Sequence, residues 1–366
     1  MNPGNLPSCL SPRPPEAAPT RPAPWVILGC IASVSSSPSD GKLEEGDDLA
    51  IEWRDPPLVS HLTLRQHGSL SAMTGDFYHD RDNYPSVVAV DSSGALLLRT
   101  TMRDPEGYDD DAWWTRSERH GGSVYILYDV CSRRAAQYRV PDHRLRRESG
   151  NIGFIAGPHG VVAELQPIPF TDRASLLCFY TERQEWASRD VRVSHAALWN
   201  RPWGSDGVVS HDRKLWWIDL ACGLLFCDPL DDDLEELQFV ALPEGCGTPA
   251  IAGDLDKSRC VRASAGRLRY VHIDAADADA PHWADHTSAW TCDFEVAFND
   301  IWEDSSYQES PMPRRVPVVA LVDPTNAAVV YFFQITARRS WMFSVDLCTK
   351  RTLRCMEYSM PNVPRR

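Results

Sequence analysis

Short apolar segments of strand length, each followed by a turn signal, constrain the fold of this chain more than any other feature. They are rich in Val, Ile, Leu, Trp, Tyr and Phe, and each is too short to form a helix. Several lack polar alternation, which indicates that both faces of the strand are buried, as in a sheet packed between two others. The clearest segments are residues 87–90, 124–128, 215–218, 329–333 and 341–343.

Many of these segments end in an Asp that precedes small or polar residues and then a returning segment. An Asp carboxylate accepts hydrogen bonds from backbone N–H groups two residues further on, so it can close a hairpin turn locally. The turn residues are Asp91, Asp129, Asp219, Asp274 and Asp346, and Thr181 takes the same place in a weaker version. Their mean spacing of 51 residues is close to the period of about 50 that is typical of kelch-like propellers.

These features predict an all-β, β-propeller-like domain of about five or six four-stranded blades around a channel. The domain should span residues 25–360, after a proline-rich leader at residues 1–24 that is expected to be disordered, and before a short tail at residues 361–366. The intervals between turns run unevenly from 38 to 72 residues, which indicates a degenerate repeat with insertions. A pair of β-sandwich or barrel domains meeting near residues 200–204 stays open as an alternative.

Two parts of the sequence fit more than one local structure. Residues 25–32 are interpreted as a first buried strand, and the alternative is the apolar part of a signal peptide. The strand is favoured because signal peptides seldom follow so proline-rich a preamble. Polar insertions are expected at residues 103–121 and 275–289, and short helices are possible only near 275–286 and 293–302.

Charge and cysteine usage limit the partners and the compartment. The formal net charge is −14 and the pI is about 5.2, which opposes binding to nucleic acid or to an anionic membrane. The longest apolar run, residues 25–34, is too short for a membrane helix. Eleven scattered cysteines form no Cys-x-x-Cys pair, and those in apolar runs, such as Cys178 and Cys227, are expected to be buried and reduced. We therefore expect an intracellular protein of the cytoplasm or nucleus.

The candidate chemical motifs have simpler structural explanations. His282 and His286 have metal-ligand spacing, but they lack the Glu of a zincin motif and follow a proline. The acidic runs 109–111 and 231–233 lack the arrangement of a calcium loop and fit solvated turns better. Residues 210–212, Ser-His-Asp, lie outside any nucleophile elbow, and neighbours on a strand point to opposite faces. The sequence thus predicts no catalytic, cofactor-binding or metal-binding residues and no cofactor.

Two pairs of tryptophans could stack on sugars or bases. Trp216 and Trp217 lie inside an apolar segment, where packing between sheets is the better interpretation. Trp113 and Trp114 lie among acidic residues in an expected loop. An exposed recognition role therefore fits the second pair better than the first.

Three neighbouring segments carry a family resemblance: Lys-Leu-Trp-Trp-Ile-Asp-Leu at 214–220, Gly-Leu-Leu-Phe-Cys-Asp-Pro at 223–229 and Leu-Gln-Phe-Val-Ala-Leu-Pro at 237–243. They resemble a plant family, expanded in grasses, that is catalogued only as domain of unknown function 1618. Further segments at 265–271, 319–326 and 330–333 support it, and the resemblance is strongest over residues 212–333. The matching segments look like strands, so the resemblance implies a fold and carries no catalytic residue.

Members of this family resemble the propeller modules of plant F-box proteins, which suggests protein recognition. The expected function is therefore a non-enzymatic protein-interaction module with loops at one end of the channel as its binding surface and a protein as its partner. One alternative is an enzyme or glycan-binding protein that uses acidic and Trp residues in the channel. A second is an F-box-type substrate adaptor that lacks a recognisable F-box.

Overall fold

The structure is a computed structural model, and it describes residues 25–35, 49–65, 85–101, 123–139, 149–193, 201–248, 254–274, 290–337 and 339–358. The fold is all-β, as the sequence predicts. The described residues include two short α-helices, α1 (Phe298–Glu303) and α2 (Ser305–Gln308), and two 3-10 turns, η4 (Ser149–Asn151) and η6 (Leu255–Lys257). Their strands form six groups, called here the first to the sixth sheet in chain order.

Four of these sheets are antiparallel meanders of four strands, in which each strand pairs with the next. The second sheet contains β5 (Ser86–Val90), β6 (Ala95–Thr101), β7 (Ser123–Asp129) and β8 (Arg134–Arg139). The third contains β9 (Ile152–Ile155), β10 (Val161–Pro167), β11 (Arg173–Tyr180) and β12 (Glu185–Val193). The fourth contains β13 (Gly207–His211), β14 (Lys214–Asp219), β15 (Gly223–Cys227) and β16 (Glu236–Ala241). The sixth contains β19 (Val318–Val322), β20 (Val329–Ile335), β21 (Ser340–Asp346) and β22 (Arg351–Tyr358).

The first and fifth sheets depart from this pattern. In the first, β4 (Val59–Arg65) pairs in parallel with β1 (Ile27–Leu28) and β2 (Ser33–Ser35), and antiparallel with β3 (Leu49–Glu52). In the fifth, the described strands are β17 (Arg259–Ser264) and β18 (Arg267–His272).

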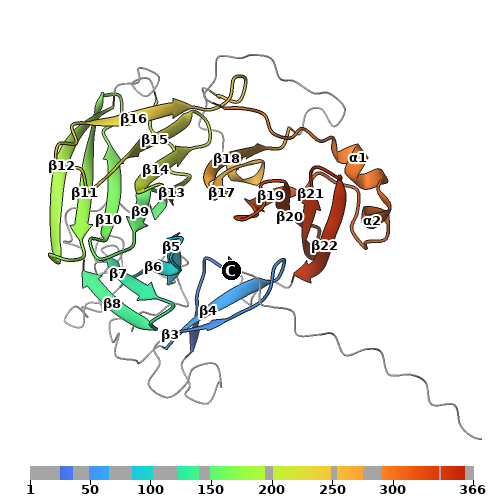
Figure 1. The fold of residues 1–366 in the computed structure, drawn as a ribbon, viewed down its shortest axis with the longest axis horizontal. Coiled ribbons are helices and arrows are strands. Elements are labelled where there is room, and N and C mark those ends of the chain that lie inside the picture. Colours follow the sequence, from blue (N-terminus) through green and yellow to red (C-terminus); the bar gives the residue numbers. More distant parts are fainter. Residues whose placement is uncertain are drawn as a thin grey trace, which may run out of the picture.

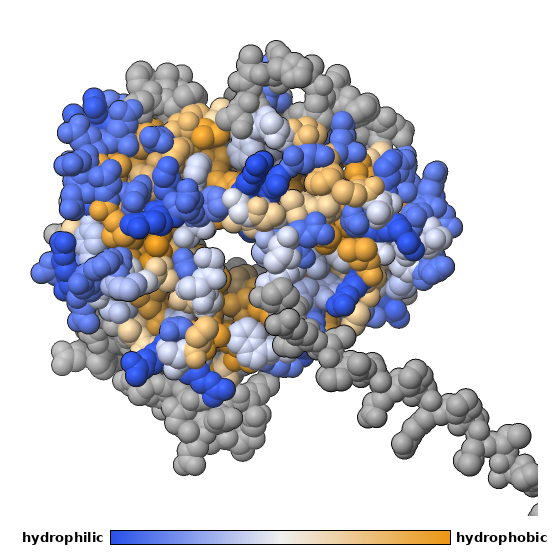
Figure 2. Space-filling model, viewed as in Figure 1, coloured by the Kyte–Doolittle hydropathy of each residue, from blue (hydrophilic) through white to orange (hydrophobic). Residues whose placement is uncertain are grey.

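The six sheets follow one another around a central opening (Figures 1 and 2). The first strands of neighbouring sheets, β5, β9, β13 and β17, lie beside one another toward this opening. The third and fourth sheets are also joined at their outer strands, where β12 pairs in parallel with β16 through two residue pairs. The resulting eight-stranded sheet folds back until its end strands nearly meet, since a Cβ on Gly153 of β9 would lie 2.4 Å from Val208 of β13.

The ring is closed by contacts between the first and the last sheet. Ile27 and Val59 of the first sheet share one buried cluster with Val329, Tyr331 and Met342 of the sixth sheet. Trp25 packs edge-on against Tyr331 with ring centroids 5.4 Å apart. In addition, the Arg354 guanidinium donates to the carbonyl of Pro56 over 2.9 Å. The two ends of the described chain therefore stabilise each other.

Most of the predicted strands are confirmed. Residues 87–90, 124–128, 215–218, 329–333 and 341–343 lie in β5, β7, β14, β20 and β21. Cys178 and Cys227 are buried, and none of the ten described cysteines forms a disulfide. The helix expected near 293–302 is confirmed only for its second part, because residues before α1 lack regular structure and Asp293 pairs with Arg269 of the fifth sheet.

The predicted strand at 25–32 is divided into β1 and β2. The cause is a change of partner, because Cys30 and Ala32 exchange backbone hydrogen bonds with Val87 and Pro85 at the start of the second sheet. The structure shows no boundary between two domains near residue 200, because Leu165 of β10 and Trp217 of β14, on either side of that point, share one buried cluster. The predicted leader 1–24, tail 361–366 and insertions 103–121 and 275–289 lie outside the described residues.

Candidate functional site

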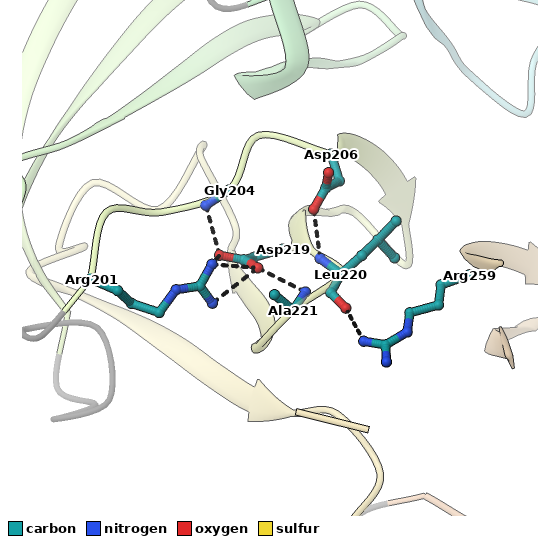
Figure 3. Close-up of polar contacts among 7 residues, drawn as sticks. All are labelled: Arg201, Gly204, Asp206, Asp219, Leu220, Ala221 and Arg259. Carbon is teal, nitrogen blue, oxygen red and sulfur yellow. Dashed lines mark hydrogen bonds and ion pairs between the residues drawn. The ribbon is translucent and has the colours of Figure 1, made fainter. Parts of the chain in front are cut away.

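A buried ion pair lies where the third sheet leads into the fourth. Asp219 ends β14 with a side chain that is only 1% exposed, and Arg201, 11% exposed, comes from the link between β12 and β13. The guanidinium binds both carboxylate oxygens, with Nη2 at 3.0 Å from Oδ2 and Nη1 at 3.3 Å from Oδ1 (Figure 3). A charge buried this deeply is tolerated because it is paired and hydrogen-bonded.

Two backbone N–H groups also donate hydrogen bonds to the Asp219 carboxylate. Ala221 donates to Oδ1 over 2.9 Å, which is the local Asp turn that the sequence predicts. Gly204 donates to Oδ2 over 2.6 Å, and a Cβ at this position would lie 3.0 Å from the carboxylate carbon. Glycine thus allows the backbone to come close enough. The same carboxylate closes a hairpin and fastens the link between two sheets.

A second set of contacts surrounds the same turn (Figure 3). The Asp206 carboxylate accepts the N–H of Leu220 over 2.7 Å, and Arg259 of the fifth sheet donates to the carbonyls of Leu220 and Cys246, both over 2.7 Å. Burial raises the pKa of Asp206, the Leu220 hydrogen bond opposes this, and the nearby Asp219 charge adds to it. The network therefore ties the third, fourth and fifth sheets together.

Arg201 also lines a small hollow. Its walls are mostly apolar and include Pro167, Ile168, Val193, Trp203 and Leu225. The buried Nε of Arg201 and Nε1 of Trp203 have no hydrogen-bond acceptor in the described part of the chain. The hollow thus combines apolar walls with two lining residues that each carry an unsatisfied N–H group.

The turn between β10 and β11 forms the exposed rim of this hollow. Its sequence is Ile-Pro-Phe-Thr-Asp at 168–172, and Ile168 and Phe170 are 42% and 66% exposed. Phe170 has a φ of 62°, in the left-handed region that bulky side chains rarely adopt. Strained conformations of this kind cost about 1–3 kcal/mol and cluster at functional sites. The turn therefore presents a large apolar side chain to solvent at a cost in conformational energy.

A third group of titratable residues lies where the segment after β16 meets the fifth sheet. The thiol of buried Cys246 lies 3.7 Å from Nδ1 of His272. Burial lowers the pKa of His272 and the Arg259 charge lowers it further, while Asp274 acts in the opposite sense. Burial also raises the pKa of the Cys246 thiol. Both groups are therefore driven toward their neutral forms, which fits packing and not an activated thiolate.

This environment predicts a pH-dependent stability. Because the pKa of His272 in the folded protein is below its ordinary value of about 6.5, the unfolded chain takes up the proton more readily. Its contribution to stability is complete above that value and is lost as the pH falls below it. When the pH is lowered through this value, the free energy of unfolding measured in urea should therefore fall more steeply in the wild type than in His272→Gln. Equal slopes would contradict the assignment.

The sequence-based site candidates have different fates in the structure. Trp217 is fully buried, and its Nε1 donates to the carbonyl of Asn151 over 2.8 Å. Trp216 stacks on Phe226 with the ring centroids 3.9 Å apart. Packing is therefore confirmed for this pair. Residues 231–233 form an exposed turn closed by the Asp231 carboxylate. Ser210 donates to Asp91 of the second sheet over 3.4 Å.

The remaining candidates, Trp113, Trp114, His282, His286 and the acidic run 109–111, lie outside the described residues. Within the residues that are described, no three His, Cys, Asp or Glu side chains gather as metal ligands would. Nor does that part of the chain contain a helix with the length and apolar character that a membrane crossing requires.

Sequence reasoning missed both Arg201 and Phe170. Arg201 is 18 residues from Asp219, and no local pattern joins them. Phe170 did carry a signal, because an Ile and a Phe lie in a Pro-containing turn between two strands. Apolar side chains in such a turn are candidates for exposure.

The structure thus defines an all-β protein whose sheets form a ring, with a buried salt bridge beside an exposed apolar turn. Residues 217–331 match the model of a family described as "Protein of unknown function (DUF1618)". The match runs from the second half of β14 to the first part of β20, and it supports the resemblance to domain of unknown function 1618 that the sequence indicates. The comparison with curated proteins finds no match.

Proposed function

We propose that this protein is a propeller-like protein-interaction module in which the six sheets are the blades. Four antiparallel meanders of four strands, each with its first strand toward a common opening, support this architecture. The contact between the first and the last sheet supports it further, because a ring of blades needs closure between its ends. We place its action inside the cell, where the exposed thiols of Cys131 and Cys348 would stay reduced.

The observation that carries the proposed function is the exposed turn at 168–172. Phe170 is 66% exposed, although burying a Phe side chain stabilises a protein by about 1.5–3 kcal/mol. Aromatic side chains exposed beside an apolar hollow are typical of the centres of protein interfaces. Loops carry the binding residues in scaffolds of this kind, while the sheets hold them in place. The turn is therefore the proposed recognition surface.

The test is affinity purification of the tagged full chain from cells that express it, beside the double variant Ile168→Ser/Phe170→Ser. We expect a reproducible set of co-purifying proteins, recovered at about one tenth of the wild-type amount or less with the variant, since interface aromatics commonly contribute a factor of ten or more. The change should leave folding intact because both side chains are exposed. The measurement is quantitative mass spectrometry of the recovered proteins.

The matched control is Leu353→Ser on β22, which removes another exposed apolar side chain from a different sheet. It should leave recovery unchanged. Recovery of chaperones alone with the wild type would contradict an interaction module. Equal recovery with the wild type and the double variant would mean that the recognition surface does not include this turn.

A further inference from the structure

The Phe170 surface consists of Ile168, Phe170, Arg173, Arg192 and the adjoining hollow. We infer that it binds an acidic segment of a partner protein, one that also carries an aliphatic or aromatic side chain. This inference rests on the proposed function and adds the chemistry of the partner.

The apolar part of the surface is held in place before any partner arrives. Ile168 donates its N–H to the carbonyl of Arg173 over 2.9 Å, and the Thr171 hydroxyl donates to the carbonyl of Ile168 over 2.9 Å. The N–H of Val193 on β12 donates to the carbonyl of Asp172 over 2.7 Å. A turn fixed by these bonds loses little conformational entropy on binding, so an apolar side chain can be bound here at small entropic cost.

The charged part of the surface is a pair of arginines next to the turn. Arg173 of β11 and Arg192 of β12 are directly opposite each other in the antiparallel ladder, and both are exposed. Like charges in this position repel each other. Among the ion pairs between described residues none includes either arginine, even though Glu236 is the register partner of Arg192. An external carboxylate would relieve this repulsion.

The chemistry of the pair favours carboxylates over other groups. A guanidinium presents its donors in a planar fork that matches a carboxylate in a bidentate manner. The hollow is also lined by Arg201 and Trp203, whose buried Nε and Nε1 lack acceptors among the described residues and could donate to a partner's oxygen that enters it. Acidic side chains spaced around an apolar one would meet both kinds of group at once.

The net charge of the molecule favours a protein segment over nucleic acid or a membrane as the partner of this surface. Nucleic acids and anionic membranes present extended arrays of phosphate, which a chain with a net charge of −14 repels more strongly than it repels the one or two carboxylates of a short segment. Two arginines on neighbouring strands can hold one or two carboxylates of a short peptide segment. A protein segment is therefore the partner that the surface fits.

The test uses a phage-displayed library of random twelve-residue peptides selected on the immobilised full chain. We expect the selected peptides to be enriched in Asp and Glu around a Leu, Phe or Trp. In fluorescence anisotropy with the synthesised peptides, Phe170→Ser should weaken binding about tenfold, as for an interface hot spot. Arg173→Glu/Arg192→Glu should weaken it at least as much, and repeating the selection on this variant should enrich Lys and Arg.

Two controls are matched to these changes. Leu353→Ser removes an exposed apolar side chain from β22, and Arg183→Glu reverses an exposed charge at the opposite end of β11 and β12. Neither should alter the affinity. Circular dichroism and the urea midpoint of each variant show whether it is folded.

The inference is overturned by selected peptides without acidic enrichment, by binding that the Phe170 and arginine variants leave unchanged, or by a library that yields no binder. Each of these results leaves the interaction module standing if the co-purification succeeds. Failure of the proposed function has a different signature, because the tagged chain would then recover chaperones alone. The two failures are therefore separable.

Discussion

Replacement of Asp219 by Ala is expected to lower the free energy of unfolding by roughly 3–5 kcal/mol, because it leaves the Arg201 guanidinium buried without its partner. The loss also removes the acceptor for the N–H groups of Gly204 and Ala221. The measurement is the urea unfolding curve. The dependence of the free energy of unfolding on urea concentration is compared between variant and wild type, because a change in this slope would indicate a changed unfolded state. Since Arg201 also borders the hollow, the same variant should loosen the wall of the Phe170 surface.

Two further variants separate the ion pair from the turn. Asp346→Ala removes an Asp from a similar turn at a more exposed site, where Oδ1 accepts the N–H of Cys348 over 2.8 Å and no ion pair with a described residue is formed. It should cost about 1 kcal/mol, the value of an ordinary hydrogen bond. Arg201→Met/Asp219→Ala should be more stable than Asp219→Ala alone. A double variant that is no more stable than Asp219→Ala would contradict the stranded-charge explanation.

The hairpin turns were predictable because their chemistry is local. Asp91, Asp129, Asp219 and Asp346 all accept the N–H of the residue two positions further on. Thr181 also lies in a turn, but its hydroxyl donates to the carbonyl of Gly160 and does not close that turn. A short-range pattern therefore predicts where the chain reverses, and does not determine which strands become neighbours.

The uneven spacing of these turns has a structural cause. Asp91 follows the first strand of its sheet, Asp219 follows the second strand, and Asp129 and Asp346 follow the third. The signal thus marks different hairpins of different sheets and not one fixed place in a repeat. Asp323 adds another turn, since its carboxylate accepts the N–H of Thr325 over 2.8 Å. The mean period was consistent with the sheets although the individual intervals were not.

The candidate site could not be predicted in the same way, because its contacts are long-range. Arg201 and Asp219 come together only when the link between two sheets folds over the β14–β15 turn. Arg173 and Arg192 become a pair only through the register of β11 and β12. Such pairings depend on tertiary structure, and burial of Arg201 has no signature in its neighbours Pro202 and Trp203.

The ring makes its own stability depend on closure, and Ile27→Asp is expected to reveal this with a loss of about 3 kcal/mol or more, since it places an unpaired charge in an apolar cluster. Ile27 is buried against the sixth sheet beside Val329 and Met342. Opening this contact would also expose Tyr331 to solvent. The measurement is urea unfolding, together with the hydrogen exchange of amides in β20 and β21.

Ile31→Asp is the matched control, because Ile31 lies four residues further along the same segment and is 42% exposed. It should change the free energy of unfolding by less than about 1 kcal/mol, as most surface substitutions do. If the first and last sheets close the ring, Ile27→Asp should speed exchange in β20 and β21 more than in β14 and β15. Equal acceleration in all four strands would instead indicate a global loss of stability without local opening, and it would contradict closure as the cause.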